Sequence, residues 1–190
     1  MLRSHALNTS SSRAGESKIG CIEAERQVLL NIKKDLRLVW YDVDPLSSWG
    51  NEEEKRDCCK WIRVECANIS GHVIRLDLSL AVVRYRSVKG QISSSLPELR
   101  YLKHLDMSSI FVSKTSIPNN IGNLDRLIYL DLSNNNISGY IPTQIANLSS
   151  LQVLDLSSNY DLTVESLEWV SNLSSLTRLD LSGVDLSKAT

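Results

Sequence analysis

Hydrophobic residues recur along the second half of the chain with a period of about 24 residues. The clearest unit runs from Leu127 to Leu148 and has apolar residues at its positions 1, 4, 6, 11, 15, 19 and 22. The leucine at position 4 recurs at Leu76, Leu105, Leu130, Leu154 and Leu179, in steps of 29, 25, 24 and 25 residues. A short, sustained period of this kind predicts a solenoid of stacked units.

Each unit begins with a short segment in which apolar and polar residues alternate. In the unit that starts at Leu127, we expect Leu130 and Leu132 to point inward and Tyr129 and Asp131 outward, because successive side chains of a strand face opposite ways. Repetition of the segment predicts parallel strands about 4.7–4.9 Å apart. The expected fold class is an α/β solenoid with a parallel β-sheet on the concave face and short 3₁₀ or irregular segments on the convex face.

An asparagine follows the strand segment in two of the units. Asn135 and Asn159 stand in this turn, where a buried amide can bond the backbone groups that a bending chain leaves unpaired. The other units carry Ala81, Ile110 and Val184 at the same place. We therefore expect an incomplete asparagine ladder.

The first third of the chain lacks the repeat and is expected to form a cap. Glu23 to Leu36 has apolar residues on one helical face, which predicts a helix. Trp49 and Trp61 are expected to cover the open end of the first repeat, since an uncapped solenoid exposes its core. We divide the chain into a disordered lead at 1–20, a helical, disulfide-bonded cap at 21–71, and about four and a half repeats at 72–190, truncated and without a C-terminal cap. The open edge of the last strand predicts self-association.

The four cysteines, Cys21, Cys58, Cys59 and Cys66, all lie in this cap. An even number in one small region indicates disulfide bonds. A bond between the adjacent Cys58 and Cys59 would be strained, which leaves two pairings: Cys21–Cys58 with Cys59–Cys66, or Cys21–Cys59 with Cys58–Cys66. The alternative is a zinc site, but the spacing Cys-Cys-x6-Cys lacks the paired ligand turns typical of zinc. We expect no bound metal.

Charge and composition exclude some classes of partner. The net charge is −1 and the pI about 6.3, so nucleic acid is not an expected partner. The chain has no apolar run of about 20 residues, so we expect no transmembrane helix in it. We also expect no cofactor.

Five glycosylation sequons suggest an oxidising, extracellular location. The candidate asparagines are Asn8, Asn68, Asn136, Asn147 and Asn172. Residues 1–20 lack the apolar core that a secretion signal needs. The two observations conflict, and from them we expect an incomplete gene product.

Several motifs together resemble the N-terminal cap of plant leucine-rich-repeat receptors. They are Cys21-Ile-Glu-Ala-Glu-Arg-Gln-Val-Leu-Leu, Pro45-Leu-Ser-Ser-Trp49, Cys58-Cys59-Lys-Trp61 and Gly71-His-Val-Ile-Arg-Leu-Asp-Leu. The repeats, with Gly139-Tyr-Ile141-Pro142, resemble the plant-specific repeat unit. The resemblance covers residues 21–190 and is strongest to receptor-like proteins of plant immunity, in the group of receptors for fungal ethylene-inducing xylanase.

This resemblance implies a protein- or peptide-recognition module, an ectodomain fragment of a cell-surface receptor-like protein in defence signalling. It implies a protein or peptide ligand, a co-receptor, membrane-anchored full-length relatives, and a location on the extracellular side of the plasma membrane. It also favours the Cys21–Cys58 and Cys59–Cys66 pairing, and a second small sheet at the Gly-x-Ile-Pro segment. Two alternatives remain: a secreted inhibitor of fungal cell-wall enzymes, similar to polygalacturonase-inhibiting proteins, and a nonfunctional truncated product.

The outward strand positions are the candidate partner-binding residues. They are Arg75, Asp77, His104, Asp106, Tyr129, Asp131, Val153, Asp155, Arg178 and Asp180. The five aspartates would form a carboxylate column, which costs free energy unless donors intervene. An open sheet lacks the water-excluding pocket that acid–base chemistry needs, so we expect no enzyme activity. His104, beside Asp106, is a candidate pH sensor.

The first unit contains a basic insertion at residues 81–90, which with Arg100 and Lys103 forms a local cluster of positive charge. Such a cluster is either a ligand-binding loop or an ordinary solvated loop, and the sequence leaves both interpretations open.

Overall fold

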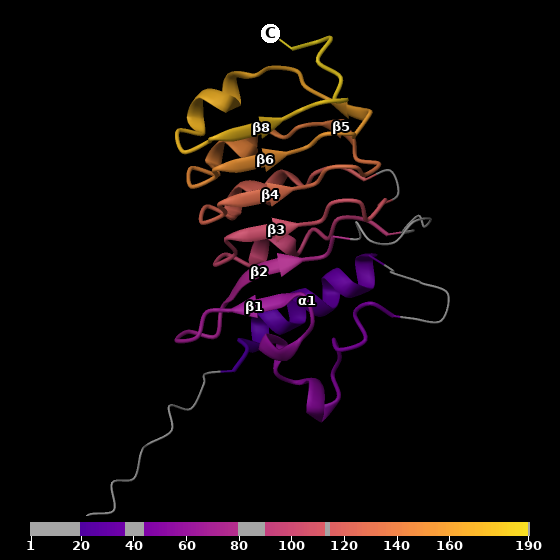
Figure 1. Cartoon of the computed structure of the whole chain (residues 1–190), viewed down its shortest axis with the longest axis vertical. Coiled ribbons are helices and arrows are strands. Elements are labelled where there is room, and N and C mark those ends of the chain that lie inside the picture. Colours follow the sequence, from indigo (N-terminus) through magenta and orange to yellow (C-terminus); the bar gives the residue numbers. More distant parts are fainter. Residues whose placement is uncertain (1–19, 37–43, 80–89, 113–114, 190) are drawn as a thin grey trace, which may run out of the picture.

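The computed structural model describes residues 20–36, 44–79, 90–112 and 115–189. It shows a helical cap at one end and a stack of coils that rises from it (Figure 1). The lead at residues 1–19, including Asn8, lies outside the described residues. So do residues 81–89, which make up almost all of the basic insertion and include Ala81.

Two parallel arrays of short elements build the stack. The main sheet has the strand order β1-β2-β3-β4-β6-β8, and a two-stranded sheet pairs β5 with β7. The strands are β1 (Val64–Cys66), β2 (Val73–Asp77), β3 (His104–Asp106), β4 (Tyr129–Asp131), β5 (Ser138–Tyr140), β6 (Val153–Asp155), β7 (Asp161–Thr163) and β8 (Arg178–Asp180). All pairs are parallel except β1 with β2, which is antiparallel.

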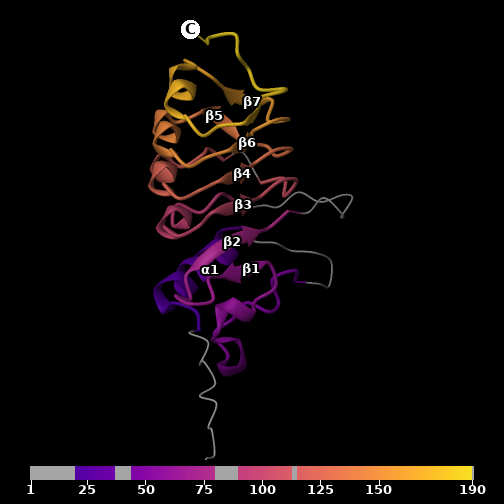
Figure 2. The same cartoon turned by 60° about the vertical axis from the view of Figure 1, so that its left-hand side comes forward.

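The helices lie in the cap and on the side of the stack that faces away from the main sheet (Figure 2). The cap holds α1 (Glu23–Leu36) and the 3₁₀ helices η1 (Glu53–Lys55) and η2 (Cys58–Lys60). The repeats contribute η3 (Leu96–Glu98), η4 (Asn119–Asn123), η5 (Thr143–Asn147) and η6 (Glu168–Asn172). A parallel sheet on the concave face with 3₁₀ helices behind it confirms the expected fold class.

The leucine at position 4 of each unit holds the strands in register. Leu76, Leu105, Leu130 and Leu154 face one another across the sheet, and each is 0% exposed. The flanking residues of each strand therefore point outward. The two-stranded sheet between β5 and β7 stands beside the main sheet, at the Gly-x-Ile-Pro segment where the family resemblance implied a second sheet.

In the turns that follow β3, β4, β6 and β8, the residue at position 8 of the repeat unit has a left-handed backbone. Ser109, Asn134, Ser158 and Gly183 have φ values of 58°, 52°, 56° and 83°. Only the last of these residues is a glycine, the type that adopts this region without steric cost.

The two turn asparagines are buried and their amides are fully used. Asn159 is 0% exposed; it accepts a hydrogen bond from the backbone N–H of Ile137 (3.1 Å) and donates to the carbonyls of Leu132 (3.0 Å) and Leu156 (2.9 Å). Asn135 makes the equivalent bonds one unit earlier. In other units Ile110 and Val184 are buried at this place, so the incomplete ladder expected from the sequence is confirmed where it is described.

Helix α1 has the bounds that its apolar pattern predicted. Val28, Leu29, Ile32 and Leu36 are buried against the core. The carboxylate of Glu25 is also buried: it accepts the backbone N–H of Val73 (2.7 Å), the first residue of β2, and lies 2.8 Å from Nδ1 of the adjacent histidine. A side chain of α1 is therefore hydrogen-bonded to the first residue of β2, because a buried carboxylate needs hydrogen-bond donors.

Trp49 and Trp61 stack with ring centroids 5.3 Å apart and are 2% and 3% exposed. Their indole N–H groups donate to the carbonyls of Ile62 (2.9 Å) and Lys55 (2.8 Å). Both rings belong to the same continuous hydrophobic core as the leucines of the repeats.

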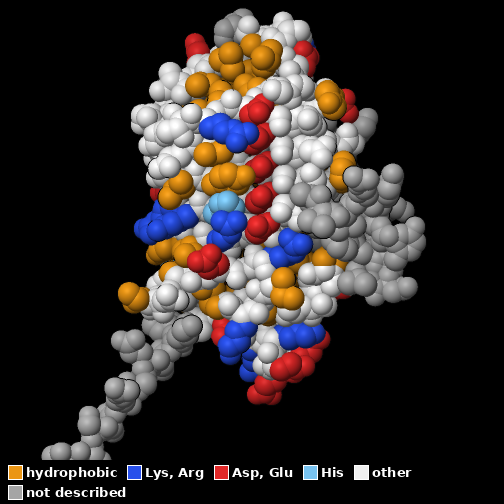
Figure 3. All heavy atoms as spheres, viewed as in Figure 1, with side chains coloured by type: hydrophobic (Ala, Val, Ile, Leu, Met, Phe, Trp, Pro, Cys, Tyr) orange, Lys and Arg blue, Asp and Glu red, His pale blue; other side chains and the backbone are white. Residues whose placement is uncertain are grey.

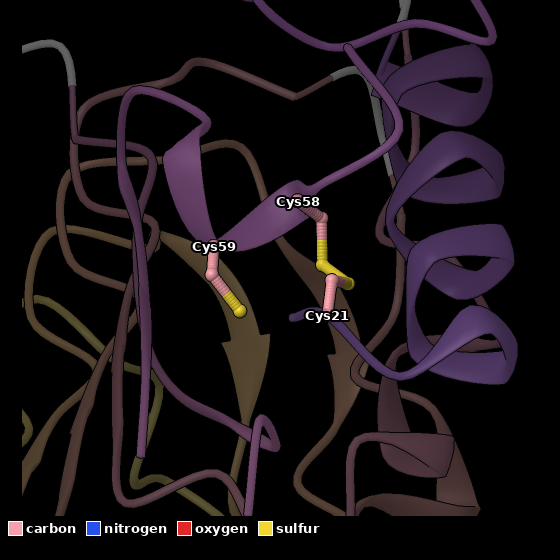
Figure 4. A group of neighbouring side chains, drawn as sticks. All are labelled: Cys21, Cys58 and Cys59. Carbon is pink, nitrogen blue, oxygen red and sulfur yellow. A yellow bond between two sulfur atoms is a disulfide. The ribbon is translucent and has the colours of Figure 1, made fainter. Parts of the chain in front are cut away.

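Two disulfides close the cap: Cys21–Cys58, with Cα atoms 5.2 Å apart, and Cys59–Cys66, with Cα atoms 5.4 Å apart. This is the pairing that the family resemblance favoured. The sulfurs of Cys21, Cys58 and Cys59 lie within 4.8 Å of one another (Figure 4). Each belongs to a disulfide, and a metal ligand would have to be a thiolate.

The two disulfides should contribute unequally to stability. They close loops with sequence separations of 37 and 7 residues, and the loss of unfolded-state entropy increases with loop length. Replacing Cys21 and Cys58 with Ser should lower the free energy of unfolding by about 4 kcal/mol, and replacing Cys59 and Cys66 by about 2 kcal/mol. Urea unfolding of the two double variants measures the difference. Equal losses of unfolding free energy in the two double variants would contradict this account. So would an unchanged free energy of unfolding when the wild-type chain is treated with reductant.

The Asn159 side chain should contribute strongly to the stability of the fold, because its amide is buried and hydrogen-bonded. Replacing Asn159 with Ala leaves the buried N–H of Ile137 and the carbonyl of Leu156 without their partner, whereas the Leu132 carbonyl keeps its hydrogen bond from Asn135. We therefore expect the free energy of unfolding to fall by about 2–4 kcal/mol. The exposed Asn136, replaced with Ala, is the matched control and should cost less than about 0.5 kcal/mol. Thermal unfolding of both variants tests this, and similar losses would count against the role of the ladder.

Candidate functional site

The ten candidate residues lie side by side in two columns on the concave sheet. Figure 3 shows one column of acidic side chains and, beside it, a column of basic, histidine and hydrophobic side chains. The first column contains Arg75, His104, Tyr129, Val153 and Arg178, and the second contains Asp77, Asp106, Asp131, Asp155 and Asp180. We call these ten residues the strand face. The structure brings all of them together, as the register of the leucines requires.

Each aspartate of the strand face first serves the turn that follows its own strand. Oδ1 of Asp106 accepts the backbone N–H (2.9 Å) and the hydroxyl (2.7 Å) of Ser108, and Asp155 bonds Ser157 in the same way. At the last strand, hydrogen bonds from Ser182 hold the pKa of Asp180 below its ordinary value. The repeated Leu-Asp-Leu-Ser pattern is therefore partly structural, and only the second carboxylate oxygen remains for other contacts.

Arginines neutralise the aspartates at the two ends of the strand face. Nη2 of Arg75 lies 3.4 Å from Oδ2 of Asp77. Nη2 of Arg178 lies 3.4 Å from Oδ2 of Asp155 and 3.9 Å from Oδ2 of Asp180. Among the described residues, no ion pair reaches the two central carboxylates, Asp106 and Asp131. Negative charge is thus concentrated at the middle of the face.

The centre of the other column is aromatic and uncharged. The rings of His104 and Tyr129 stack with centroids 4.2 Å apart, and the Tyr129 hydroxyl donates to Oδ2 of Asp131 (3.0 Å). Burial and the charge of Asp131 raise the pKa of Tyr129. Burial, and after it the charge of Arg75, lower the pKa of His104. Both groups are therefore neutral at pH 7.

One candidate is less accessible than its outward position implied. Asp155 is only 9% exposed, because Arg178 on the next strand pairs with it. At the opposite end, a hollow of about 250 Å³ lies beside Arg75 and Asp77 and is also lined by Arg63 and Glu65 of the cap. The strand face is an open, shallow surface.

A second aromatic cluster, which the sequence patterns did not indicate, lies at the start of the strands. His72 stacks on Tyr101 with ring centroids 3.6 Å apart, and the guanidinium of Arg126 lies 4.5 Å from the Tyr101 centroid. All three residues immediately precede the first apolar position of their units, so the repeat period itself was the signal that could have identified them.

The described glycosylation candidates lie away from the strand face. Asn68, Asn136, Asn147 and Asn172 are exposed. Asn147 and Asn172 end the convex helices η5 and η6, and Asn136 lies in the turn before β5. Trp169 is buried in η6, on the convex side of the stack. Sugars at these four sites would leave the concave sheet uncovered.

In the parts of the chain that the structure describes, no helix has both the length and the apolar character to cross a bilayer.

Two family profiles match the chain. The family described as "Leucine rich repeat" matches residues 115–160 and 126–186, and the "Leucine rich repeat N-terminal domain" matches residues 22–67.

The curated relatives include two receptor-like proteins of Solanum lycopersicum. Receptor-like protein EIX1 is 43% identical over 176 residues, which cover 88% of this chain and 17% of the relative. Receptor-like protein EIX2 is 45% identical over 131 residues, which cover 66% of this chain and 12% of the relative. The chain therefore spans less than a fifth of the length of these relatives.

Solved structures show the same architecture. A plant ice-binding protein superposes with a TM-score of 0.72 at 28% identity, over 87% of this chain and 50% of that chain. The PEPR1–AtPEP1 crystal structure superposes with a TM-score of 0.68 at 30% identity, over 82% of this chain and 20% of that chain.

The position of His104 between Arg75 and the carboxylates predicts its titration. The folded state holds its pKa below the ordinary 6.5, so unfolded chains bind more protons as the pH falls. The contribution of His104 to stability should therefore be complete above pH 6.5 and decline as the pH falls through the window below it. Histidine NMR titration should give a midpoint under 6.5. The midpoint should rise in R75Q and fall in D106N, whereas a wild-type midpoint at or above 6.5 would contradict the assignment.

Proposed function

Because this chain belongs to the leucine-rich-repeat receptor-like proteins of plants, we propose that its strand face recognises a protein or peptide ligand outside the cell. The observation that carries the proposal is the register of five strands, which presents ten charged, aromatic and aliphatic side chains on one open surface. Extended side-by-side columns suit a macromolecular partner better than a small molecule, which needs a concave pocket.

The distribution of charge indicates which ligand would fit. Arginines stand at both ends of the face, and the unneutralised Asp106 and Asp131 lie at its centre beside the His104–Tyr129 stack. A ligand with a basic group over the centre and acidic groups toward the ends would be complementary. Charge complementarity of this kind raises association rates and selects among partners.

The surroundings of the face agree with an extracellular role. Two disulfides close the cap, and disulfides persist in oxidising compartments. The four described sequons are exposed and lie off the strand face. We propose glycosylation at these asparagines and a location on the outer side of the plasma membrane, and we keep residues 21–71 and 72–190 as the cap and the repeats.

The relatives guide the finer assignment. The names of the two Solanum lycopersicum relatives identify them as receptor-like proteins, and one structural neighbour is PEPR1 with AtPEP1. By analogy, we propose that this chain contributes the first repeats of a receptor in defence signalling that works with a co-receptor. The solved BIR3–SERK2 complex from Arabidopsis thaliana, 33% identical with a TM-score of 0.64, supports the co-receptor part of this proposal.

Selection from a displayed random-peptide library tests the proposal. Peptides enriched on the wild-type chain should bind the D106N/Y129A/D131N variant about tenfold more weakly or worse. Asparagine keeps an acceptor for the serine turn, so the fold of that variant should persist. The matched control, T143A/Q144A/E168A on the exposed convex side, should bind as the wild type does.

Loss of binding in the convex variant alone, or equal binding by all three proteins, would contradict the assignment of the strand face. Inhibition of fungal polygalacturonase by the wild-type chain would instead favour a secreted inhibitor.

A further inference from the structure

A basic flank borders the strand face at the start of β3 and β4. We define it by four exposed residues, Tyr101, Lys103, Arg126 and Ile128. Two of them directly precede His104 and Tyr129 of the strand face in sequence. Figure 3 shows basic side chains on this side of the first column, with the acidic column on the other side. The concave surface is therefore positive along one margin and negative along the other.

The two cations of the flank are not neutralised within the described part of the chain. Lys103 and Arg126 form no ion pair with any described residue. Their neighbours in sequence include Arg100 and Asp125, which are both exposed and whose opposite charges offset each other. The flank thus presents two positive charges that have no partner among the described residues.

A stack of side chains that begins in the cap holds Arg126 in place. Oε1 of Glu25 lies 2.8 Å from Nδ1 of His72, and the ring of His72 stacks on Tyr101 with centroids 3.6 Å apart. The guanidinium carbon of Arg126 lies 4.5 Å from the Tyr101 centroid, where the ring attracts a cation. A guanidinium that is already ordered loses less conformational entropy when it binds a partner.

The chemistry of the flank favours an acidic polypeptide over other anions. The guanidinium of Arg126 matches a carboxylate with two parallel N–H donors. Ile128, 37% exposed, offers an apolar contact beside the charges. The ring of Tyr101 lies between His72 of the preceding unit and Arg126 of the following one. Its faces are therefore not free to stack a nucleobase or a sugar ring.

We propose that the basic flank docks an acidic segment of a partner protein. One carboxylate of that segment binds Arg126, a second binds Lys103, and an apolar side chain contacts Ile128. His72 and Tyr101 are positioning residues, because they act through the guanidinium that they hold. The proposal concerns the flank alone and does not depend on the ligand of the strand face, so either proposal can fail without the other.

Selection from a displayed random-peptide library, with counter-selection against K103Q/R126Q, tests the proposal. Peptides that bind the wild-type chain but not this variant should contain at least two acidic residues and an aliphatic one. The same peptides should bind Y129A as they bind the wild type, because Y129A alters the strand face without a change of charge. Enrichment of no flank-dependent peptide would overturn the proposal.

The affinities of the selected peptides for further variants separate a built site from general attraction by charge. K103Q/R126Q should bind them at least about tenfold more weakly. R126K keeps the charge but lacks the planar fork and should bind about threefold more weakly. The matched control R56Q/K60Q removes two exposed positive charges of the cap and should bind as the wild type does.

Two substitutions of Tyr101 test the positioning role. Y101F keeps the ring on which Arg126 lies, so its affinity for the peptides should equal that of the wild type. Y101A releases the guanidinium without a change of charge and should bind about threefold more weakly. Equal binding by Y101A and the wild type in chains that both remain folded by thermal unfolding would contradict this role.

Three outcomes would overturn the docking surface itself. Equal losses of affinity in R56Q/K60Q and K103Q/R126Q would show attraction by net charge only. Tighter binding of polygalacturonate than of the acidic peptides would assign the flank to a polysaccharide. Peptides that are lost in Y129A but kept in K103Q/R126Q would support the strand face and leave the flank without a partner.

Discussion

The burial of one leucine in each of four neighbouring parallel strands of the main sheet is the constraint on which this molecule depends. Leu76, Leu105, Leu130 and Leu154 are each 0% exposed and aligned across the main sheet. Each contributes about 1.5–3 kcal/mol by leaving water. A shift of one residue would turn that leucine to solvent and an aspartate into the core. The hydrophobic register therefore determines which side chains form the strand face.

The same constraint explains why the capped end of the stack differs from its middle. Within the stack, each strand edge is paired by a neighbouring unit, whereas the first strand of the repeats meets the cap instead. At the cap, a buried carboxylate from α1, the antiparallel β1 and two disulfides cover the first strand.

The sequence alone predicted the features that depend on the short-range spacing of apolar and polar residues. The bounds of α1, the inward leucines, the outward columns and the buried Asn135 and Asn159 followed from spacing and polarity. The reduced exposure of Asp155 did not, because it results from an ion pair with Arg178 on the neighbouring strand. The stack of His72, Tyr101 and Arg126 and the bond from Glu25 to β2 were also missed. These contacts join residues 25 to 48 positions apart, and no single unit of the pattern specifies them.

The most direct test of the account is a crystal structure of this chain, measured at the aspartates of the strand face. The account predicts that the Cα atoms of Asp77, Asp106, Asp131, Asp155 and Asp180 follow one another at intervals of about 4.8 Å, with every carboxylate on the concave side and Leu76, Leu105, Leu130 and Leu154 in the core. A strand displaced by one residue, with its aspartate turned inward and its leucine in solvent, would contradict it.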